Sequence, residues 1–161
     1  MITIYEFLDN NNITYELFNH PAVFTCEQAE KVCPKMPGAS IKNLFLYDSK
    51  TNKYFLVIVG KEKQVDFKQF RKMLNAPRLS FASPEQLKKH LGVDPGSVTI
   101  LGLINDVENA AQVIFDINLE NKMLQCHPLV NTATLTISFE GIKKFLSLTK
   151  HNYILLDIPT R

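Results

Sequence analysis

The stretch that most constrains this chain is Pro37-Gly38-Ala39-Ser40-Ile41-Lys42-Asn43-Leu44-Phe45-Leu46. A Pro-Gly pair, which is typical of turns, leads into an apolar run that we interpret as a buried strand. Lys42 and Asn43 stand at the mouth of this strand, where burying an amine or an amide is costly unless each finds a partner. Two interpretations are open: both side chains lie just outside the sheet in water, or they meet a ligand.

The segments around this stretch predict an α+β fold. Two apolar runs, 41–47 and 54–59, are joined by six polar residues, which is the strongest hairpin signal in the chain. An apolar segment at 98–103 is interrupted by Gly102, which predicts a bulge or a close approach of two backbones. Capping patterns and apolar periodicity predict helices over 3–11, 25–33, 66–74, 83–91 and 138–148. Further strands are expected at 14–18, 78–81, 112–115, 123–126, 135–137 and 153–158.

Size and composition favour one domain over residues 1–161, built as a mixed, curled β-sheet with several short helices packed around it. No apolar run has the length of a membrane span, and the N-terminus lacks a signal-peptide pattern. The chain has three cysteines, Cys26, Cys33 and Cys126. Their number is odd and their spacing is not that of a metal site, which favours reduced thiols in a cytoplasmic protein. We therefore expect a cytoplasmic monomer with no metal and no cofactor.

Charge gives a weaker indication of a partner. A net charge of +2 does not by itself argue for nucleic acid, but basic residues outnumber acidic ones between Lys61 and Arg78. Lys68, Arg71 and Lys72 recur at helical spacing on one face of the helix expected there. That face could follow an RNA phosphate backbone, or it could be an ordinary solvated surface, which we slightly favour.

A second polar stretch, His127-Pro128-Leu129-Val130-Asn131-Thr132-Ala133-Thr134, carries the remaining candidate chemistry. The chain has no phosphate-cradling glycine loop, no nucleophile elbow and no histidine pair at metal spacing. A cysteine with His127 or His20 as base is an alternative that we rank low, since a free cysteine is usually a buried hydrophobe. Taken alone, each histidine favours a structural role.

The joint pattern of motifs resembles the YbaK/ProX family, which comprises prolyl-tRNA editing proteins and the related insertion domain of bacterial prolyl-tRNA synthetases. The resemblance covers about residues 5–156, and its freestanding alanine-specific branch is the nearest match. No single motif is decisive, but five occur in the expected order. They are His20-Pro21-Ala22-Val23-Phe24-Thr25, the Pro37–Leu46 stretch, Phe81-Ala82-Ser83, Pro95-Gly96-Ser97-Val98 leading to Gly102-Leu103-Ile104-Asn105-Asp106, and the His127–Thr134 stretch.

The resemblance implies an enzyme that hydrolyses the ester between a wrong small amino acid, above all alanine, and the 3′ end of tRNA specific for proline. It makes Lys42 the essential residue and places Asn43, His127 and Asn131 around the aminoacyl-adenosine. The same resemblance places Gly102 in the pocket wall. Because the site must admit alanine and reject proline on size, we predict a small, closed pocket lined by backbone and by residues such as Ala133 or Gly102, with Thr132 as a further substrate-binding candidate. The acceptor stem is a candidate partner of the basic helix face. Prolyl-tRNA synthetase is a further candidate partner. In this family the 2′-hydroxyl of the tRNA is described as helping to deliver water.

Three alternatives stay open at this point. One is a catalytically silent module that binds charged tRNA or a synthetase, although the intact Lys42 argues against it. Another is a regulator or a small-molecule hydrolase on the same fold, because fold does not fix function. Within the deacylase interpretation, the amino acid removed could instead be cysteine or serine.

Overall fold

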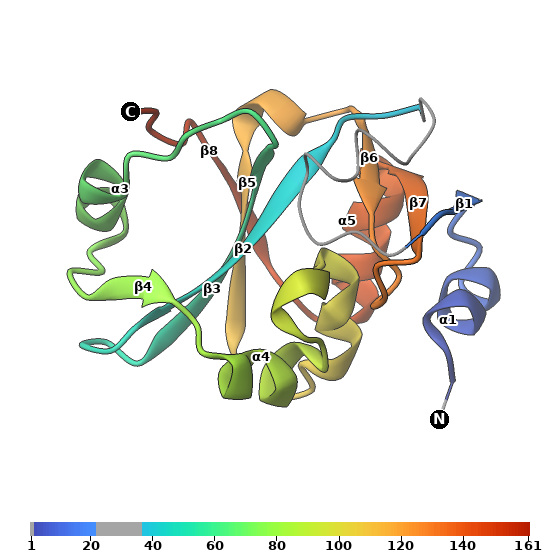
Figure 1. The fold of residues 1–161 in the computed structure, drawn as a ribbon, viewed down its shortest axis with the longest axis horizontal. Coiled ribbons are helices and arrows are strands. Elements are labelled where there is room, and N and C mark those ends of the chain that lie inside the picture. Colours follow the sequence, from blue (N-terminus) through green and yellow to red (C-terminus); the bar gives the residue numbers. More distant parts are fainter. Residues whose placement is uncertain (1, 22–36) are drawn as a thin grey trace.

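The structure is a computed structural model that describes residues 2–21 and 37–161, and its strands form two sheets (Figure 1). A three-stranded antiparallel sheet has the order β1-β7-β6, and a five-stranded mixed sheet has the order β4-β2-β3-β5-β8. The strands are β1 (Tyr15–Asn19), β2 (Ile41–Asp48), β3 (Lys53–Gly60), β4 (Leu79–Phe81), β5 (Ala111–Asp116), β6 (Met123–Cys126), β7 (Ala133–Ser138) and β8 (Tyr153–Leu156).

The predicted α+β class is confirmed, but the expected single curled sheet is divided. Strand β7 pairs with β1 on one side and β6 on the other, so the small sheet is complete without the large one. Just before β2, an isolated parallel bridge between Ala39 and Leu124 joins the two sheets. The turn-rich start of the Pro37–Leu46 stretch therefore leads from the small sheet into the large one.

The predicted hairpin is confirmed as β2 and β3, which pair antiparallel from Ile41–Gly60 to Asp48–Lys53. Its turn is held by the buried Asp48, whose carboxylate accepts a hydrogen bond from the Thr51 amide at 3.0 Å. The parallel neighbours β5 and β8 complete the far side of the large sheet. This arrangement fixes the direction in which the first residues of β2 point.

The helices begin where the capping patterns predicted. They are α1 (Ile4–Asn10), α3 (Phe67–Leu74), α4 (Pro84–Leu91) and α5 (Phe139–Leu148), with 3-10 helices η1 (Pro95–Ser97), η2 (Ile100–Asn105) and η3 (Ile117–Leu119). The side chains of Thr3, Asp66, Ser83 and Ser138 each accept a hydrogen bond from the backbone amide three residues later. The helix expected at 25–33 lies outside the described residues.

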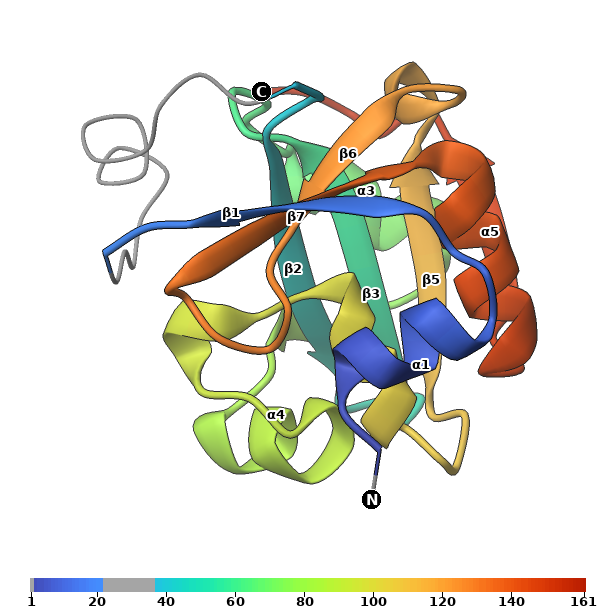
Figure 2. The ribbon, with the colours of Figure 1, turned by 90° about the vertical axis from the view of Figure 1, so that its right-hand side faces the viewer.

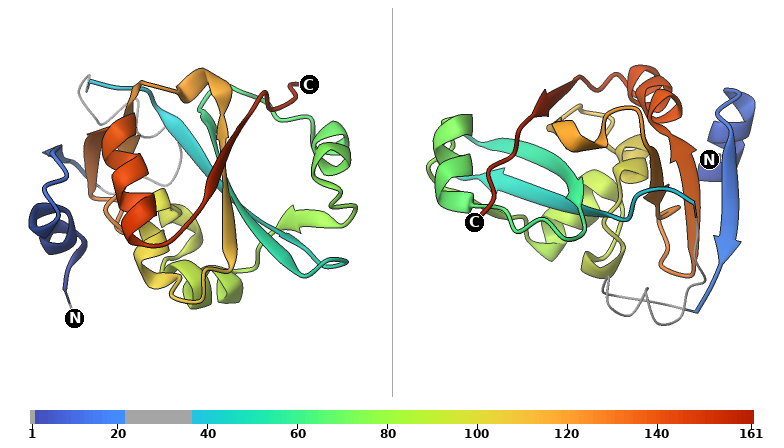
Figure 3. Two further views of the ribbon diagram at one scale, coloured as in Figure 1. Left: turned by 180° about the vertical axis from the view of Figure 1, so that it is seen from behind. Right: turned by 90° about the horizontal axis from the view of Figure 1, so that it is seen from above.

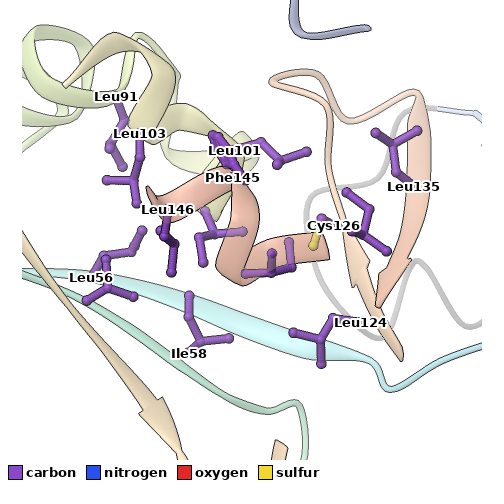
Figure 4. Packing of buried hydrophobic residues seen from close by; sticks show 14 of the residues in the cluster. Leu56, Ile58, Leu91, Leu101, Leu103, Leu124, Cys126, Leu135, Phe145 and Leu146 are labelled. Atoms are coloured by element: carbon purple, nitrogen blue, oxygen red, sulfur yellow. The ribbon is translucent and has the colours of Figure 1, made fainter. Parts of the chain in front are cut away.

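Two hydrophobic clusters lie between the layers of the fold, whose arrangement is seen in Figures 2 and 3. The larger one fills the space between the two sheets, together with α5 and the α4–η2 unit. Figure 4 shows its labelled members, among them Leu56 of β3, Leu124 of β6 and Phe145 of α5. The smaller cluster lies on the opposite face of the large sheet, where Phe70 of α3 packs. Because both faces of β2 and β3 are buried, their sequences are nearly continuous apolar runs.

The apolar segment at 98–103 folds into η2 rather than into a bulged strand. The predicted close approach at Gly102 is confirmed, because a Cβ atom added there would lie 3.1 Å from both the Cβ and the carbonyl oxygen of Leu91. Glycine therefore allows η2 to lie directly against the end of α4. No helix within residues 2–21 and 37–161 is long and apolar enough to cross a membrane.

Candidate active site

Asn43 points from β2 into the space between the two sheets. Alternate residues of a strand face opposite sides, and Asn43 shares its side with Phe45 of the larger cluster. The Asn43 Oδ1 atom accepts a hydrogen bond of 3.0 Å from the backbone amide of Ile100 in η2. This use of Oδ1 leaves the NH₂ group of Asn43, a donor only, for other partners.

Lys42 has a different environment because it belongs to the other face of β2. It shares that face with Leu44 and Leu46, which pack in the smaller cluster. The half-buried Lys42 ammonium donates to the backbone carbonyl of Lys63, and the Lys63 ammonium forms an ion pair of 2.7 Å with Asp116. The structure thus does not bring the Lys42 ammonium together with Asn43, and the role that the resemblance gives Lys42 stays a prediction.

His127 lies in the loop between β6 and β7 and is half-buried. The next residue, Pro128, is buried, and Leu129 has a backbone φ of 69°. A bulky residue in this left-handed region is uncommon and persists only where its surroundings hold it. The main chain around His127 is therefore in a specific conformation rather than an open loop.

The His127 ring is held in one tautomer. Its Nδ1 atom lies 3.3 Å from the carbonyl oxygen of Ala133, and because a carbonyl only accepts, Nδ1 carries the proton of the neutral ring. Burial lowers the pKa of His127, and the nearby His20 lowers it further, against the raising effect of the Ala133 carbonyl. The ring is therefore neutral at pH 7, with the lone pair on Nε2. No described residue makes a hydrogen bond to Nε2, which can accept a proton.

Asn131 and Thr132 follow His127 in the same loop, and Ala133 is the first residue of β7. The Asn131 side chain is half-buried and makes no hydrogen bond within the described residues, so its amide can serve a ligand. Thr132 is exposed, and its carbonyl accepts a hydrogen bond of 2.9 Å from the His20 backbone amide. Ala133 is buried and contributes the carbonyl that orients the His127 ring.

Thr99 is a residue of this region that the sequence analysis missed. Its buried hydroxyl donates a hydrogen bond of 2.7 Å to the His127 carbonyl, and the next residue, Ile100, is the partner of Asn43. The signal for it was present, since Thr99 stands between the two halves of one family motif. We refer to Asn43, Thr99, His127, Asn131 and Ala133 together as the His127 site.

His20, taken alone, was expected to have a structural role, and the structure shows which one. Its Nδ1 lies 2.8 Å from the Pro21 carbonyl, so Nε2 accepts from the hydroxyl of the buried Thr134 at 2.9 Å. The hydrogen bond from Thr134 to His20 thereby joins the end of β1 to the start of β7, next to the His127 site. Its position in a family motif was the sequence signal for this role.

The other predicted site residues lie apart from this group. Gly102 is buried and faces Leu91, so a role in a pocket wall stays a prediction. On α3, Lys68 and Lys72 are exposed. Arg71 is half-buried instead, since its Nε donates to the Leu79 carbonyl at 3.0 Å and its guanidinium lies 6.0 Å from the centre of the Phe67 ring. Arg71 therefore has a structural task as well.

Cys126 does not have the environment of a nucleophile. It is buried at the end of β6, and burial raises the pKa of its thiol to about 12, so the reactive thiolate is not populated at neutral pH. Cys26 and Cys33 lie outside the described residues. Within the described ranges, no group of three or more His, Cys, Asp or Glu side chains has the arrangement of a metal site.

Comparisons with known proteins assign the chain to a family. Residues 20–145 match the family described as aminoacyl-tRNA editing domain. The prolyl-tRNA editing protein ProX of Acetoanaerobium sticklandii is 32% identical over 152 residues, covering 94% of this chain and 93% of that protein. The prolyl-tRNA synthetase associated domain-containing protein 1 of Danio rerio is 34% identical over 155 residues, covering 94% and 84%.

A solved structure shares the fold. The crystal structure described as a trans-editing enzyme for prolyl tRNA synthetase superposes with a TM-score of 0.69 at 17% identity, covering 98% of this chain and 96% of that one. At this identity the match shows the fold alone, and the sequence relatives carry the assignment. The chain therefore belongs to the aminoacyl-tRNA editing domain family, the YbaK/ProX family that its motifs resemble.

Proposed function

We propose that this protein is a trans-acting deacylase that removes alanine from tRNA specific for proline. The observation that carries the proposal is the His127 ring, which is neutral, fixed through Nδ1, and has no hydrogen bond to Nε2 within the described residues. A general base needs a pKa at or below the working pH and a free lone pair, and His127 has both. The names of the two relatives supply the link to proline tRNA.

In the proposed reaction, water attacks the carbonyl carbon of the aminoacyl ester. The Nε2 of His127 takes the proton of that water, directly or through the 2′-hydroxyl of the terminal ribose. The bond from the carbonyl carbon to the 3′ oxygen breaks, and the proton passes to that oxygen, which releases alanine and free tRNA. An aminoacyl ester is already activated, so orientation and one base are sufficient chemistry.

The two asparagines take different parts in this proposal. Because Asn43 Oδ1 is bonded to the Ile100 amide, Asn43 can only donate toward the substrate, and its NH₂ group suits the ester carbonyl oxygen or a ribose hydroxyl. Asn131 keeps both its oxygen and its NH₂ group available, so it can pair with a ribose hydroxyl in either sense. In this proposal Thr132 and Ala133, which follow Asn131 in the chain, also line the substrate site.

Lys42 remains in the proposal as the residue that holds a phosphate or the polarised carbonyl. Its ammonium must exchange the Lys63 carbonyl for the substrate and reach around the first residues of β2, because strand alternation places its side chain on the face opposite to Asn43. Replacing Lys42 by Met keeps the apolar stem and removes the charge. A fall in kcat/KM without a fall in Tm supports substrate contact, whereas a fall in Tm with full activity assigns Lys42 to the Lys63 loop alone.

Alanine is the proposed amino acid because a synthetase pocket sized for proline cannot strongly exclude a smaller side chain. One methylene discriminates by only about 1–3 kcal/mol, so a second site that admits alanine and rejects proline on size is needed. The proposed partners are therefore the acceptor end of proline tRNA and prolyl-tRNA synthetase. A cytoplasmic monomer is the form in which we expect the protein to act.

The test is deacylation of alanyl-tRNA specific for proline, with cysteinyl-, seryl- and prolyl-tRNA measured alongside. We expect rapid loss of alanine, sparing of proline, and a large fall in rate for His127→Gln. Faster loss of cysteine or serine would keep a deacylase and change its substrate. Binding of all four charged tRNAs without any hydrolysis would replace the proposal by a binding module.

A further inference from the structure

Thr99 is a fully buried residue whose hydroxyl is fixed from both sides. The Oγ1 atom lies 2.7 Å from the His127 carbonyl oxygen, which can only accept, so the hydroxyl proton points at His127. The same oxygen accepts a hydrogen bond of 3.2 Å from the Leu101 backbone amide. Turning the hydroxyl proton to another partner would therefore remove this hydrogen bond from the His127 carbonyl.

This hydroxyl fixes the main chain of the His127 loop to η2. In the described part of the chain, no other hydrogen bond joins η2 to residues 127–132. The adjacent Ile100 amide holds Asn43, so two consecutive residues fix two parts of the site that are far apart in sequence. The loop beyond needs such support, because Leu129 has a φ of 69° that a bulky residue rarely adopts.

We propose that Thr99 is a positioning residue for the deacylation, whose hydroxyl fixes the His127 main chain so that the ring Nε2 meets the reacting water. Thr99 does not touch the substrate. It acts through His127, and it leaves binding of the charged tRNA largely unchanged. This inference rests on the proposed function for its activity readout, but its structural link to His127 can be measured without any substrate.

The test compares Thr99→Val with Thr99→Ser and with a matched control. Valine has nearly the shape of threonine but lacks the hydroxyl, whereas serine keeps it. Thr136 in β7 is the control, because it is equally buried and its Oγ1 has no hydrogen-bond partner within the described residues. Thr99→Ala removes the hydroxyl without adding bulk, and it replaces Thr99→Val in every comparison if the valine variant does not fold.

For Thr99→Val we expect kcat to fall about ten- to hundred-fold, as for a misplaced catalytic group, with KM changed less than about two-fold. Thr99→Ser is expected to retain most of kcat, and Thr136→Val to match the wild type. In the free protein, NMR titration of the His127 ring is expected to give a pKa closer to 6.5 in Thr99→Val than in the wild type, because the ring loses its buried position.

The two readouts separate the failure of this inference from the failure of the proposed function. If the wild type hydrolyses none of the charged tRNAs, the proposed function fails, and the NMR titration alone decides the role of Thr99. If the wild type is active and Thr99→Val has the same kcat and the same His127 pKa as the wild type, Thr99 is a packing residue and this inference is overturned. A fall in kcat of equal size in Thr136→Val also overturns it.

Discussion

Two polar clusters with a histidine lie toward opposite ends of the large sheet, and they differ in how completely they are bonded. The Asp106 cluster consists of Asp106, His151, His90 and the amides of Ala110 and Ala111, near the Tyr54 end of β3. The His127 site lies near the other end of β3, where Asn43 pairs with Ile58. Both clusters fix a histidine ring through hydrogen bonds, but they leave different atoms unused.

In the Asp106 cluster both ring nitrogens of His151 are engaged. Nε2 lies 2.9 Å from the Asp106 carboxylate, and Nδ1 lies 2.9 Å from the Thr149 hydroxyl. Burial alone raises the pKa of Asp106, but the hydrogen bonds from His151, Ala111 and Ala110 outweigh it and lower that pKa. A buried ring such as that of His151, with both nitrogens paired, stabilises the fold and has no free nitrogen for a ligand.

In the His127 site, by contrast, several polar atoms make no hydrogen bond to the protein among the described residues. They are Nε2 of His127, the NH₂ group of Asn43 and the whole Asn131 amide. All three residues are half-buried and their unused atoms are accessible to solvent, so a ligand can reach and pair with them. We therefore propose that one cluster serves stability and the other chemistry. The substitutions below test that division.

The largest effect is expected for Asp106→Ala, on stability. The change leaves the buried His151 ring and the Ala110 and Ala111 amides without their acceptor, and breaking a buried pair in this way costs about 3–5 kcal/mol. Urea unfolding followed by circular dichroism measures it, with deacylation per folded molecule as the second readout. Unchanged stability would contradict the structural role assigned to this cluster.

His127→Gln is expected to have the complementary effect. Glutamine keeps an amide that can donate to the Ala133 carbonyl but provides no base, so kcat falls about hundred-fold, which corresponds to about 2.7 kcal/mol. The free energy of unfolding is expected to change by less than about 1 kcal/mol, since the ring is only half-buried. His151→Gln is the matched control, and loss of activity there without loss of stability would contradict the division.

A third expectation concerns pH, because burial lowers the pKa of His127 in the folded protein. Activity is expected to fall on the acidic side, through an apparent pKa below 6.5, and this limb should be absent in His127→Gln. The same group binds its proton more tightly when unfolded, so its contribution to stability is lost as pH falls from about 6.5 to the folded value. An acidic limb with an apparent pKa above 6.5 would contradict a ring that partial burial keeps neutral.

Local signals in the sequence were sufficient for most of the fold. The caps at Thr3, Asp66, Ser83 and Ser138 and the β2–β3 hairpin depend on neighbours close in the chain, and these predictions are confirmed. The division into two sheets was missed because it depends on which strands pair over long distances. The pairing of β1 with β7 joins residues more than a hundred positions apart.

The site shows the same limit. Motifs indicated His127, Asn43 and Asn131. Strand alternation implied that Lys42 and Asn43 face opposite sides, but the sequence could not show which partner each side chain meets there. Thr99 was overlooked because a threonine beside an apolar run is an ordinary core residue unless its hydroxyl partner is known. The partner here is the backbone carbonyl of residue 127. Every residue type has such a carbonyl, so the sequence at that position gives no sign of the hydrogen bond.

The smallest expected effect concerns the basic face of α3, where Lys68 and Lys72 are exposed while Arg71 is partly used by the Leu79 carbonyl. If both lysines contact tRNA phosphates, Lys68→Gln with Lys72→Gln lowers the slope of log affinity against log salt by about two. Lys150→Gln, at the exposed lysine beside His151, is the control and should leave the slope unchanged. Because kcat depends on the His127 site, it should stay constant at saturating tRNA. An unchanged slope in the double variant would mean that α3 presents a solvated surface, and the acceptor stem would then have to approach the His127 site from another side.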